Sequence, residues 1–323
     1  MNSCLVHDPV VKRFARLLRS QRLAHAYLFI GPREIGKSET ALAAAKLINC
    51  EDNRDGQRET FCGQCSSCLK IESGNHPDIF FIDRGESESI KIGQIRELIN
   101  RLHLRPFEAA KKICIIKDVE HLTTEGSNAL LKTLEEPSES SVLILTTSVP
   151  EENLGTVVSR CHAVSFRPES NRRVKARLVE EEALDAPAAH CLAAFAEGCA
   201  GRARRLKEED FFRRKNEMID NMVFQANNDP YLKKILTDKE QSKRLLDVLL
   251  SWYRDLLVLK AGGEKQHVVN SDRWEDLQRA GPRHTFEQLK DIMAEIVKTR
   301  RMLGENLNVK IPLILLREKI WAR

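Results

Sequence analysis

The sequence predicts an α/β domain followed by a region made only of helices. Before Pro168, short apolar runs alternate with helical segments, which is the pattern of a parallel sheet with helices on both faces. A glycine-rich phosphate-binding loop follows the first apolar run. Beyond Pro168 the strand-like runs disappear and charged amphipathic segments take over. This change of pattern predicts a domain boundary, and a softer one is expected near Asp210.

Each expected strand is a short apolar run bounded by polar or turn-forming residues. The runs cover residues 26–30, 78–82, 113–117, 142–146 and 163–166. The expected helices follow from apolar residues at helical spacing, as at Ile92, Ile95 and Leu98. Pro137 ends a helix that begins near Thr124. In the second half, residues 243–259 and 286–302 have the same amphipathic pattern.

Composition narrows the class of protein. The 323 residues carry a net charge of only +5, which is too small to argue for nucleic-acid binding by itself. The first thirty residues lack the features of a signal peptide, and no stretch of eighteen apolar residues occurs. We therefore expect a cytoplasmic protein. The nine cysteines are an odd number in a long chain, which favours metal binding over a disulfide framework.

A phosphate-binding motif, G-x-x-x-x-G-K-S, runs from Gly31 to Ser38. It follows the strand expected at 26–30 and leads into a helix, which is the context this motif requires. Gly31 and Gly36 would let backbone N–H groups close around phosphate oxygens. Lys37 would supply a positive charge, and Ser38 could ligate magnesium. The alternative is a glycine-rich turn without a ligand.

Hydrolysis of a bound nucleotide requires a carboxylate at the end of a neighbouring strand to hold the magnesium ion. The candidate strand ends in Lys117-Asp118-Val119-Glu120. In the usual alignment the metal-binding position falls on Lys117, whose charge would repel magnesium. A shift by one residue would make Asp118 the ligand and Glu120 the base. Both alignments stay open at this stage.

Four cysteines lie close together in a polar segment, with the spacing C-x11-C-x2-C-x2-C. Four thiolates complete the tetrahedral coordination of zinc, so such a site is structural rather than catalytic. The metal replaces a hydrophobic core that so short a segment cannot build. The alternative is a set of ordinary free thiols. The expected ligands are Cys50, Cys62, Cys65 and Cys68.

Taken together and in this order, the motifs resemble the delta-prime family of bacterial DNA polymerase III clamp-loader subunits, a branch of the AAA+ family. The most specific segments are 128–137, NALLKTLEEP, and the triplet Ser159-Arg160-Cys161. The resemblance extends over nearly the whole chain. Its other motifs are HAYLF at 25–29, HPD at 76–78, RPFE at 105–108, and a weaker match at 300–309.

The resemblance implies an AAA+ P-loop domain over residues 1–168, with an inserted zinc module at about 50–74. It also implies a helical lid over 169–210 and an all-α collar over 211–323 through which subunits associate. The implied partners are the gamma/tau and delta subunits of a five-membered ring. That ring uses ATP to open a sliding clamp and place it on primed DNA.

Three further residues receive roles from the resemblance. Arg160 would reach into the ATP site of a neighbouring subunit, where a guanidinium stabilises charge during phosphoryl transfer. Thr146 matches a position that senses the γ-phosphate, although threonines are common at strand ends. Arg202 matches a lid arginine that contacts the subunit's own nucleotide, although it could equally be a solvated residue at a helix start.

The leading hypothesis is a non-hydrolysing stator that binds or once bound nucleotide and gives Arg160 to a neighbour. Lys117 agrees with that role, whereas the retained Lys37 and Ser38 depart from the most degenerate relatives. The first alternative is an ATP-hydrolysing motor subunit like gamma or tau. The second is a stand-alone zinc protein that binds nucleic acid, against which the near-neutral charge argues.

Overall fold

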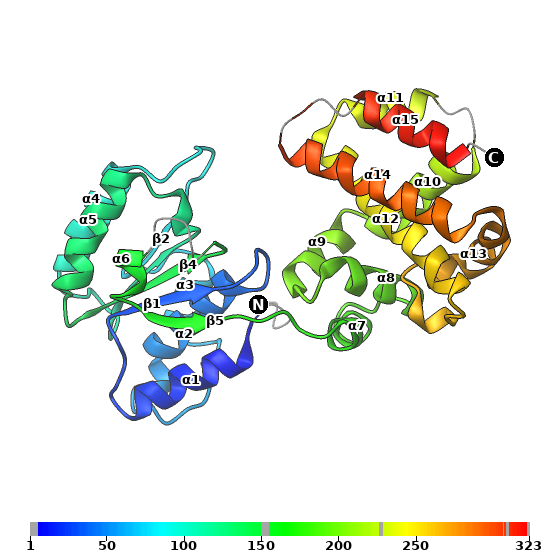
Figure 1. The fold of residues 1–323 in the computed structure, drawn as a ribbon. Helices are drawn as coiled ribbons and strands as arrows, with labels where there is room; N and C mark the ends of the chain where they lie inside the picture. Colours follow the sequence, from blue (N-terminus) through cyan, green and yellow to red (C-terminus); the bar gives the residue numbers. More distant parts are fainter. Residues whose placement is uncertain (1–5, 150–154, 226–228, 306, 308–309, 322–323) are drawn as a thin grey trace. The chain divides into compact units, whose positions relative to one another are not determined.

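The computed structural model describes residues 6–149, 155–225, 229–305, 307 and 310–321 (Figure 1). The chain forms two compact units. The first comprises Met1–Glu169 with Gly198–Arg202, and the second comprises Ser170–Glu197 with Ala203–Arg323. The expected three-domain division, with separate lid and collar, stays a prediction.

A five-stranded parallel sheet forms the centre of the first unit, with the order β2-β3-β4-β1-β5. Every expected strand is present, with bounds within one residue of the prediction. Strand β1 lies where the order of strands reverses, and ligands of open α/β sheets bind at the carboxyl ends of strands at such a point. The strands are β1 (Ala26–Ile30), β2 (Ile79–Ile82), β3 (Lys112–Ile116), β4 (Ser141–Thr147) and β5 (His162–Ser165).

Helices cover both faces of this sheet (Figure 1). Alternate residues of each strand face opposite layers, because successive side chains of a strand point to opposite faces. On β4, Val142 and Ile144 pack against helices α1 and α2, whereas Leu143 and Leu145 pack against α4, α5 and α6. The bounds are α1 (Asp8–Arg19), α2 (Lys37–Asn49), α4 (Ile92–His103), α5 (Thr124–Glu135) and α6 (Gly155–Val158).

An insertion between α2 and β2 carries the clustered cysteines. It contains a short 3-10 helix (Glu51–Asn53) and helix α3 (Ser66–Glu72). Cys50 directly follows the last residue of α2, and Cys65 is the N-cap of α3. The insertion is therefore anchored on the helix that begins at the phosphate loop.

A buried carboxylate explains two of the short sequence motifs. Asp78 accepts hydrogen bonds of 2.9 Å from the backbone N–H groups of Phe107, Glu108 and Ala109. Burial raises the pKa of Asp78, but these hydrogen bonds outweigh it and hold the pKa below the ordinary value. The HPD and RPFE motifs therefore contact each other, and the contact fixes the loop that follows α4. The side chain of Phe107 in this loop is 84% exposed.

The second unit is made of helices around one hydrophobic core. Helix α12 lies at its centre, with Trp252 and Tyr253 fully buried, and packs along α14. The expected ranges 243–259 and 286–302 fall inside these two helices. Among the described residues, no helix is long and apolar enough to cross a membrane. The helices are α7 (Asn171–Glu180), α8 (Ala186–Ala196), α9 (Ala200–Glu208, which belongs to this unit from Ala203 on), α10 (Phe211–Ile219), α11 (Asp229–Leu236), α12 (Lys239–Lys260), α13 (Trp274–Ala280), α14 (Phe286–Gly304) and α15 (Lys310–Trp321).

Candidate nucleotide site, thiolate cluster and edge arginine

The phosphate loop connects the carboxyl end of β1 to the first residue of α2. Gly36 is the N-cap of α2 and has φ 102°, a backbone conformation that residues with a Cβ atom rarely adopt. Gly31 is required for a different reason, since a Cβ atom there would lie 2.7 Å from the Phe166 carbonyl oxygen. The path of the backbone therefore requires glycine at both motif positions. The loop ends at the N-terminus of a helix, where backbone N–H groups can bind an anion.

Lys37 is only 5% exposed, and its ammonium group lies inside the loop. It donates hydrogen bonds of 2.7 Å to the Gly31 carbonyl and 2.8 Å to the Pro32 carbonyl. Burial lowers the pKa of Lys37, and the carboxylates of Asp118 and Glu120 oppose this effect. A positive charge at the loop is therefore balanced by two nearby acids.

A cavity of about 270 Å³ opens at this loop. Ser38 and Asp118 line it together, so a hydroxyl and a carboxylate of the kind that ligate magnesium share one space. Lys117 lines an adjoining hollow, and its ammonium lies 5.9 Å from the centre of the Phe81 ring. The cavity lining consists of Arg33, Glu34, Gly36, Lys37, Ser38, Glu39, Arg84, Asp118 and His121.

Thr146 lies behind Asp118 at the carboxyl end of β4. Its side chain is 1% exposed, and its Oγ1 accepts a 3.0 Å hydrogen bond from the backbone N–H of Asp118. Glu120 is held in a similar way by Ser148, whose Oγ donates to Glu120 Oε1 at 2.6 Å. Thr146 therefore contacts the cavity through the Asp118 backbone, and its predicted sensing role stays a prediction.

The segment Gly198–Arg202 belongs to the first unit and packs on the phosphate loop. The Gly201 N–H donates to the Glu34 carbonyl at 2.9 Å, and a Cβ atom on Gly201 would lie 2.5 Å from that oxygen. Arg202 Nε lies 3.8 Å from Glu34 Oε2. Arg202 is thus beside the loop, as a contact with the chain's own nucleotide would require.

Arg160 lies at the other end of the sheet from the phosphate loop. It precedes the edge strand β5, which runs parallel to β1, whereas the loop follows β1. The length of β5 alone separates the two ends by about 13 Å. An arginine placed there is at an exposed edge, where a second subunit could meet it, and far from the chain's own loop.

Three groups of the same chain hold the Arg160 guanidinium. Nη1 donates to the Thr156 carbonyl at 3.0 Å and to Ser159 Oγ at 3.3 Å. Nη2 donates to Glu135 Oε1 at 2.5 Å. Glu135 is the last residue of α5 and belongs to the NALLKTLEEP segment. The two most specific motifs of the sequence therefore contact each other.

The four clustered cysteines converge, with their sulfur atoms all within 4.8 Å of one another. Backbone N–H groups point at the sulfurs, as in the donation from Cys68 to Cys65 Sγ at 3.4 Å. Burial raises the pKa of Cys65, but this donation and neighbouring ones outweigh it and lower the pKa to about 7. Four converging sulfurs with N–H donors around them fit a tetrahedral zinc ion.

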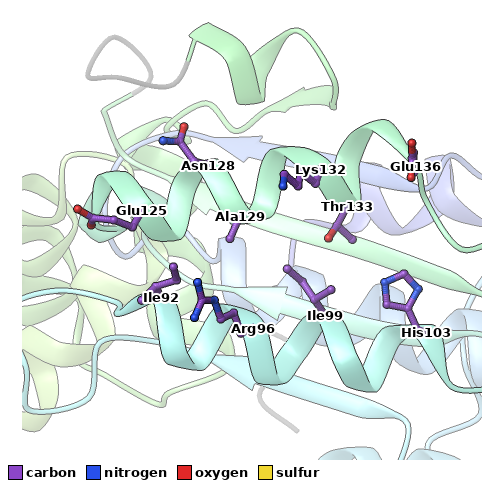
Figure 2. A pocket seen from close by; sticks show the side chains of 10 residues that line it. All are labelled: Ile92, Arg96, Ile99, His103, Glu125, Asn128, Ala129, Lys132, Thr133 and Glu136. Atoms are coloured by element: carbon purple, nitrogen blue, oxygen red, sulfur yellow. The ribbon is translucent and has the colours of Figure 1, made fainter.

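A groove of about 470 Å³ lies along the packed pair α4 and α5. Figure 2 shows the side chains that line it. Ile92 and Ile99 from α4 and Ala129 from α5 give it apolar walls, and Arg96 and Lys132 add positive charges. Glu136 lines this groove, whereas its neighbour Glu135 turns to Arg160. The sequence did not predict the groove, because it depends on how two amphipathic helices lie side by side.

The structure thus brings most of the expected residues into three separate places. Gly31, Gly36, Lys37, Ser38 and Arg202 lie at the phosphate loop, the cysteines lie in the insertion, and Arg160 lies at the sheet edge, apart from the other expected residues. Sequence reasoning missed Glu34 and Glu135, the acidic partners of Arg202 and Arg160. The one available signal was the unusual specificity of the segment that contains Glu135.

Comparison with known families gives two matches along the chain. A family model described as DNA polymerase III, delta subunit, matches residues 6–170. A second, described as DNA polymerase III, delta subunit, C terminal, matches residues 209–318. The first match covers most of the first unit, and the second match lies in the second unit.

Individual relatives agree with these models. The chain is 28% identical over 309 residues to DNA polymerase III subunit delta' of Bacillus subtilis, covering 93% of this chain and 92% of that protein. It is 35% identical over 207 residues to subunit tau of Escherichia coli, covering 62% of this chain but 31% of the relative. Among solved structures, a gamma subunit-related protein of Thermotoga maritima aligns with 96% of this chain and 98% of its own, at 19% identity and a TM-score of 0.45.

Proposed function

Since the chain belongs to the DNA polymerase III delta-subunit family, we propose that it is a delta-prime-type stator of the clamp loader, the assembly that places a sliding clamp on primed DNA. In this role it joins gamma/tau and delta subunits in a ring. It gives Arg160 to the ATP site of its neighbour and does not itself turn over ATP. The observation that carries the proposal is the position of Arg160 at the free edge of the sheet, away from the chain's own phosphate loop.

The chemistry of such a donated arginine is electrostatic. Charge develops on the γ-phosphate oxygens during transfer, and a guanidinium with two parallel donors stabilises it. Arg160 is 35% exposed, so its side chain is accessible to a partner while backbone and hydroxyl groups still limit its rotation. The guanidinium has five N–H groups, and Thr156, Ser159 and Glu135 accept from three of them, so N–H groups remain for the oxygens of a neighbour's triphosphate.

The remaining sites support the same role. Gly31, Gly36, Lys37 and Ser38 would hold the phosphates of a nucleotide, with Arg202 at its side and Thr146 behind Asp118. Cys50, Cys62, Cys65 and Cys68 would hold zinc, which would fix the insertion to the end of α2 and supply no catalysis. Nucleotide in this chain would then stabilise the subunit rather than drive the ring.

The test is the substitution Arg160→Ala in a reconstituted clamp loader with its sliding clamp. We expect the rate of ATP hydrolysis at the site that receives Arg160 to fall by about 10³-fold. The total clamp-stimulated rate of the ring then loses the contribution of that one site. Phosphate release under single-turnover conditions measures it. Assembly of the ring, followed by size-exclusion chromatography, should not change.

The matched control is Arg167→Ala, which removes another exposed arginine that follows β5. We expect this variant to retain full clamp-stimulated hydrolysis. Normal hydrolysis in the Arg160→Ala ring would overturn the proposal. An equal loss in both variants would mean that the edge as a whole, and not Arg160, is required.

One observation favours a second candidate function, that of an ATP-hydrolysing motor subunit similar to gamma or tau. Asp118 lines the phosphate-loop cavity beside Ser38, whereas Lys117 lies in the adjoining hollow. This geometry is what a one-residue shift of the magnesium ligand would require. The stator and the motor differ in whether the isolated chain hydrolyses ATP.

A further inference from the structure

The acidic partner of Arg160 comes from a different element of the chain. Glu135 ends helix α5, and Arg160 follows helix α6, so the contact joins residues 25 positions apart. The buried side chains of Leu130 and Leu134 pack helix α5 against one face of the sheet. Glu135 is therefore carried by a rigid element, while the segment around Arg160 is a turn between α6 and β5.

Both side chains of the pair are partly exposed to solvent. Glu135 is 51% exposed and Arg160 is 35% exposed, and ion pairs at such exposure contribute little to the stability of a fold. The contact nevertheless limits the rotamers of a long side chain that has several rotatable bonds. Together with the Thr156 carbonyl it holds the guanidinium at two of its nitrogens, Nη1 and Nη2.

We propose that Glu135 is a positioning residue that holds Arg160 in the orientation in which the neighbouring ATP site receives it. The inference rests on the proposed function of Arg160. An arginine that is already ordered loses less side-chain entropy when it meets the transition state, so the neighbour's kcat gains from the contact. Glu135 itself touches no nucleotide.

The test is Glu135→Gln in the reconstituted clamp loader, which keeps the shape of the side chain and removes its charge. We expect kcat for clamp-stimulated hydrolysis to fall about two- to fivefold with KM unchanged, as suits an exposed ion pair. The melting temperature of the isolated chain should stay within about 1 °C of the unsubstituted chain, since a structural role would lower it. Glu135→Asp, which keeps the charge, should recover part of the lost rate.

The adjacent Glu136 offers a matched control. It lines the groove between α4 and α5 (Figure 2), whereas the ion pair with Arg160 is made by Glu135, so Glu136→Gln should leave kcat unchanged. In the double variant with Arg160→Ala, Glu135→Gln should cause no further loss, because a positioning residue acts only through the group it positions.

The outcomes separate this inference from the proposed function. If Arg160→Ala has no effect, the proposed function fails, and the positioning role fails with it. If Arg160→Ala lowers hydrolysis while Glu135→Gln leaves kcat unchanged or raises it, the positioning role alone is overturned. A further loss in the double variant would also overturn it, since Glu135 would then act independently.

Discussion

At the residue scale, Lys117 and Asp118 distinguish the proposed stator from a motor subunit, because hydrolysis requires a magnesium ligand at the end of this strand. We expect the isolated chain to bind Mg-ATP and to release no phosphate above background. Lys37→Ala should weaken binding at least about tenfold, because a charged hydrogen bond to phosphate contributes about 1.5–3 kcal/mol. A fluorescent ATP analogue measures the affinity, and a phosphate sensor measures turnover.

Lys132→Ala provides the comparison, since it removes an exposed lysine of the same unit away from the loop. It should bind nucleotide as tightly as the unsubstituted chain. Phosphate release by the isolated chain that both Lys37→Ala and Asp118→Asn abolish would contradict the stator role. That result would identify Asp118 as the magnesium ligand of a motor subunit.

The direction of the Asp118 side chain could not be predicted from the sequence. On β3, Ile113 and Ile115 face the layer that contains α2, so strict alternation would point Lys117 to the same side as the phosphate loop. Asp118 instead has φ 50°, a left-handed conformation that ends the alternation. The motif residues of the loop were predictable, because glycine and lysine at that spacing already define the chemistry.

At the scale of single elements, the cysteine insertion gives the clearest experiment. We expect one zinc ion per purified chain, measured by elemental analysis, and its loss in Cys65→Ser. Without the metal the insertion loses the core that the four thiolates provide, and the melting temperature should fall by about 5 °C or more. The fall follows from the anchoring of Cys50 at the end of α2.

Cys161→Ser is the comparison for this experiment, because Cys161 lies outside the cluster and burial raises its pKa to about 12. That variant should retain its zinc. A purified chain that contains no zinc, or whose melting temperature does not change when a chelator is added, would contradict the prediction that zinc stabilises the insertion.

The strands of the first unit were predictable because each is a buried apolar run, whereas helix α1 was not identified. Its apolar residues Val10, Val11, Phe14 and Ala15 recur at helical spacing and are buried, so this helix was readable from the sequence but was not predicted. The contact between Glu135 and Arg160 could not be predicted from the sequence either. It depends on the end of α5 lying beside the turn after α6, and no spacing rule connects those positions.

At the scale of the whole molecule, the change of class near Pro168 was readable from the sequence, but the membership of each unit was not. Residues 198–202 return to the first unit because Gly198 and Gly201 pack closely on its backbone. A Cβ atom on Gly198 would lie 2.3 Å from the Glu169 carbonyl oxygen. A segment that belongs to a different unit from its sequence neighbours is placed by long-range contacts, and the periodicity of apolar residues does not reveal those contacts.

Assembly provides the last prediction. Helix α15 leaves Ile311 70% exposed and Leu315 54% exposed, one turn apart, while Leu313 and Leu316 are buried in the core. In the proposed ring, an exposed apolar pair of this kind is expected to meet another subunit. The substitutions Ile311→Asp and Leu315→Asp together should therefore keep the folded chain out of a complex with tau and delta subunits, measured by native mass spectrometry. Glu318→Ala, on the same helix, should assemble normally, and full assembly of the double variant would place the ring contacts elsewhere.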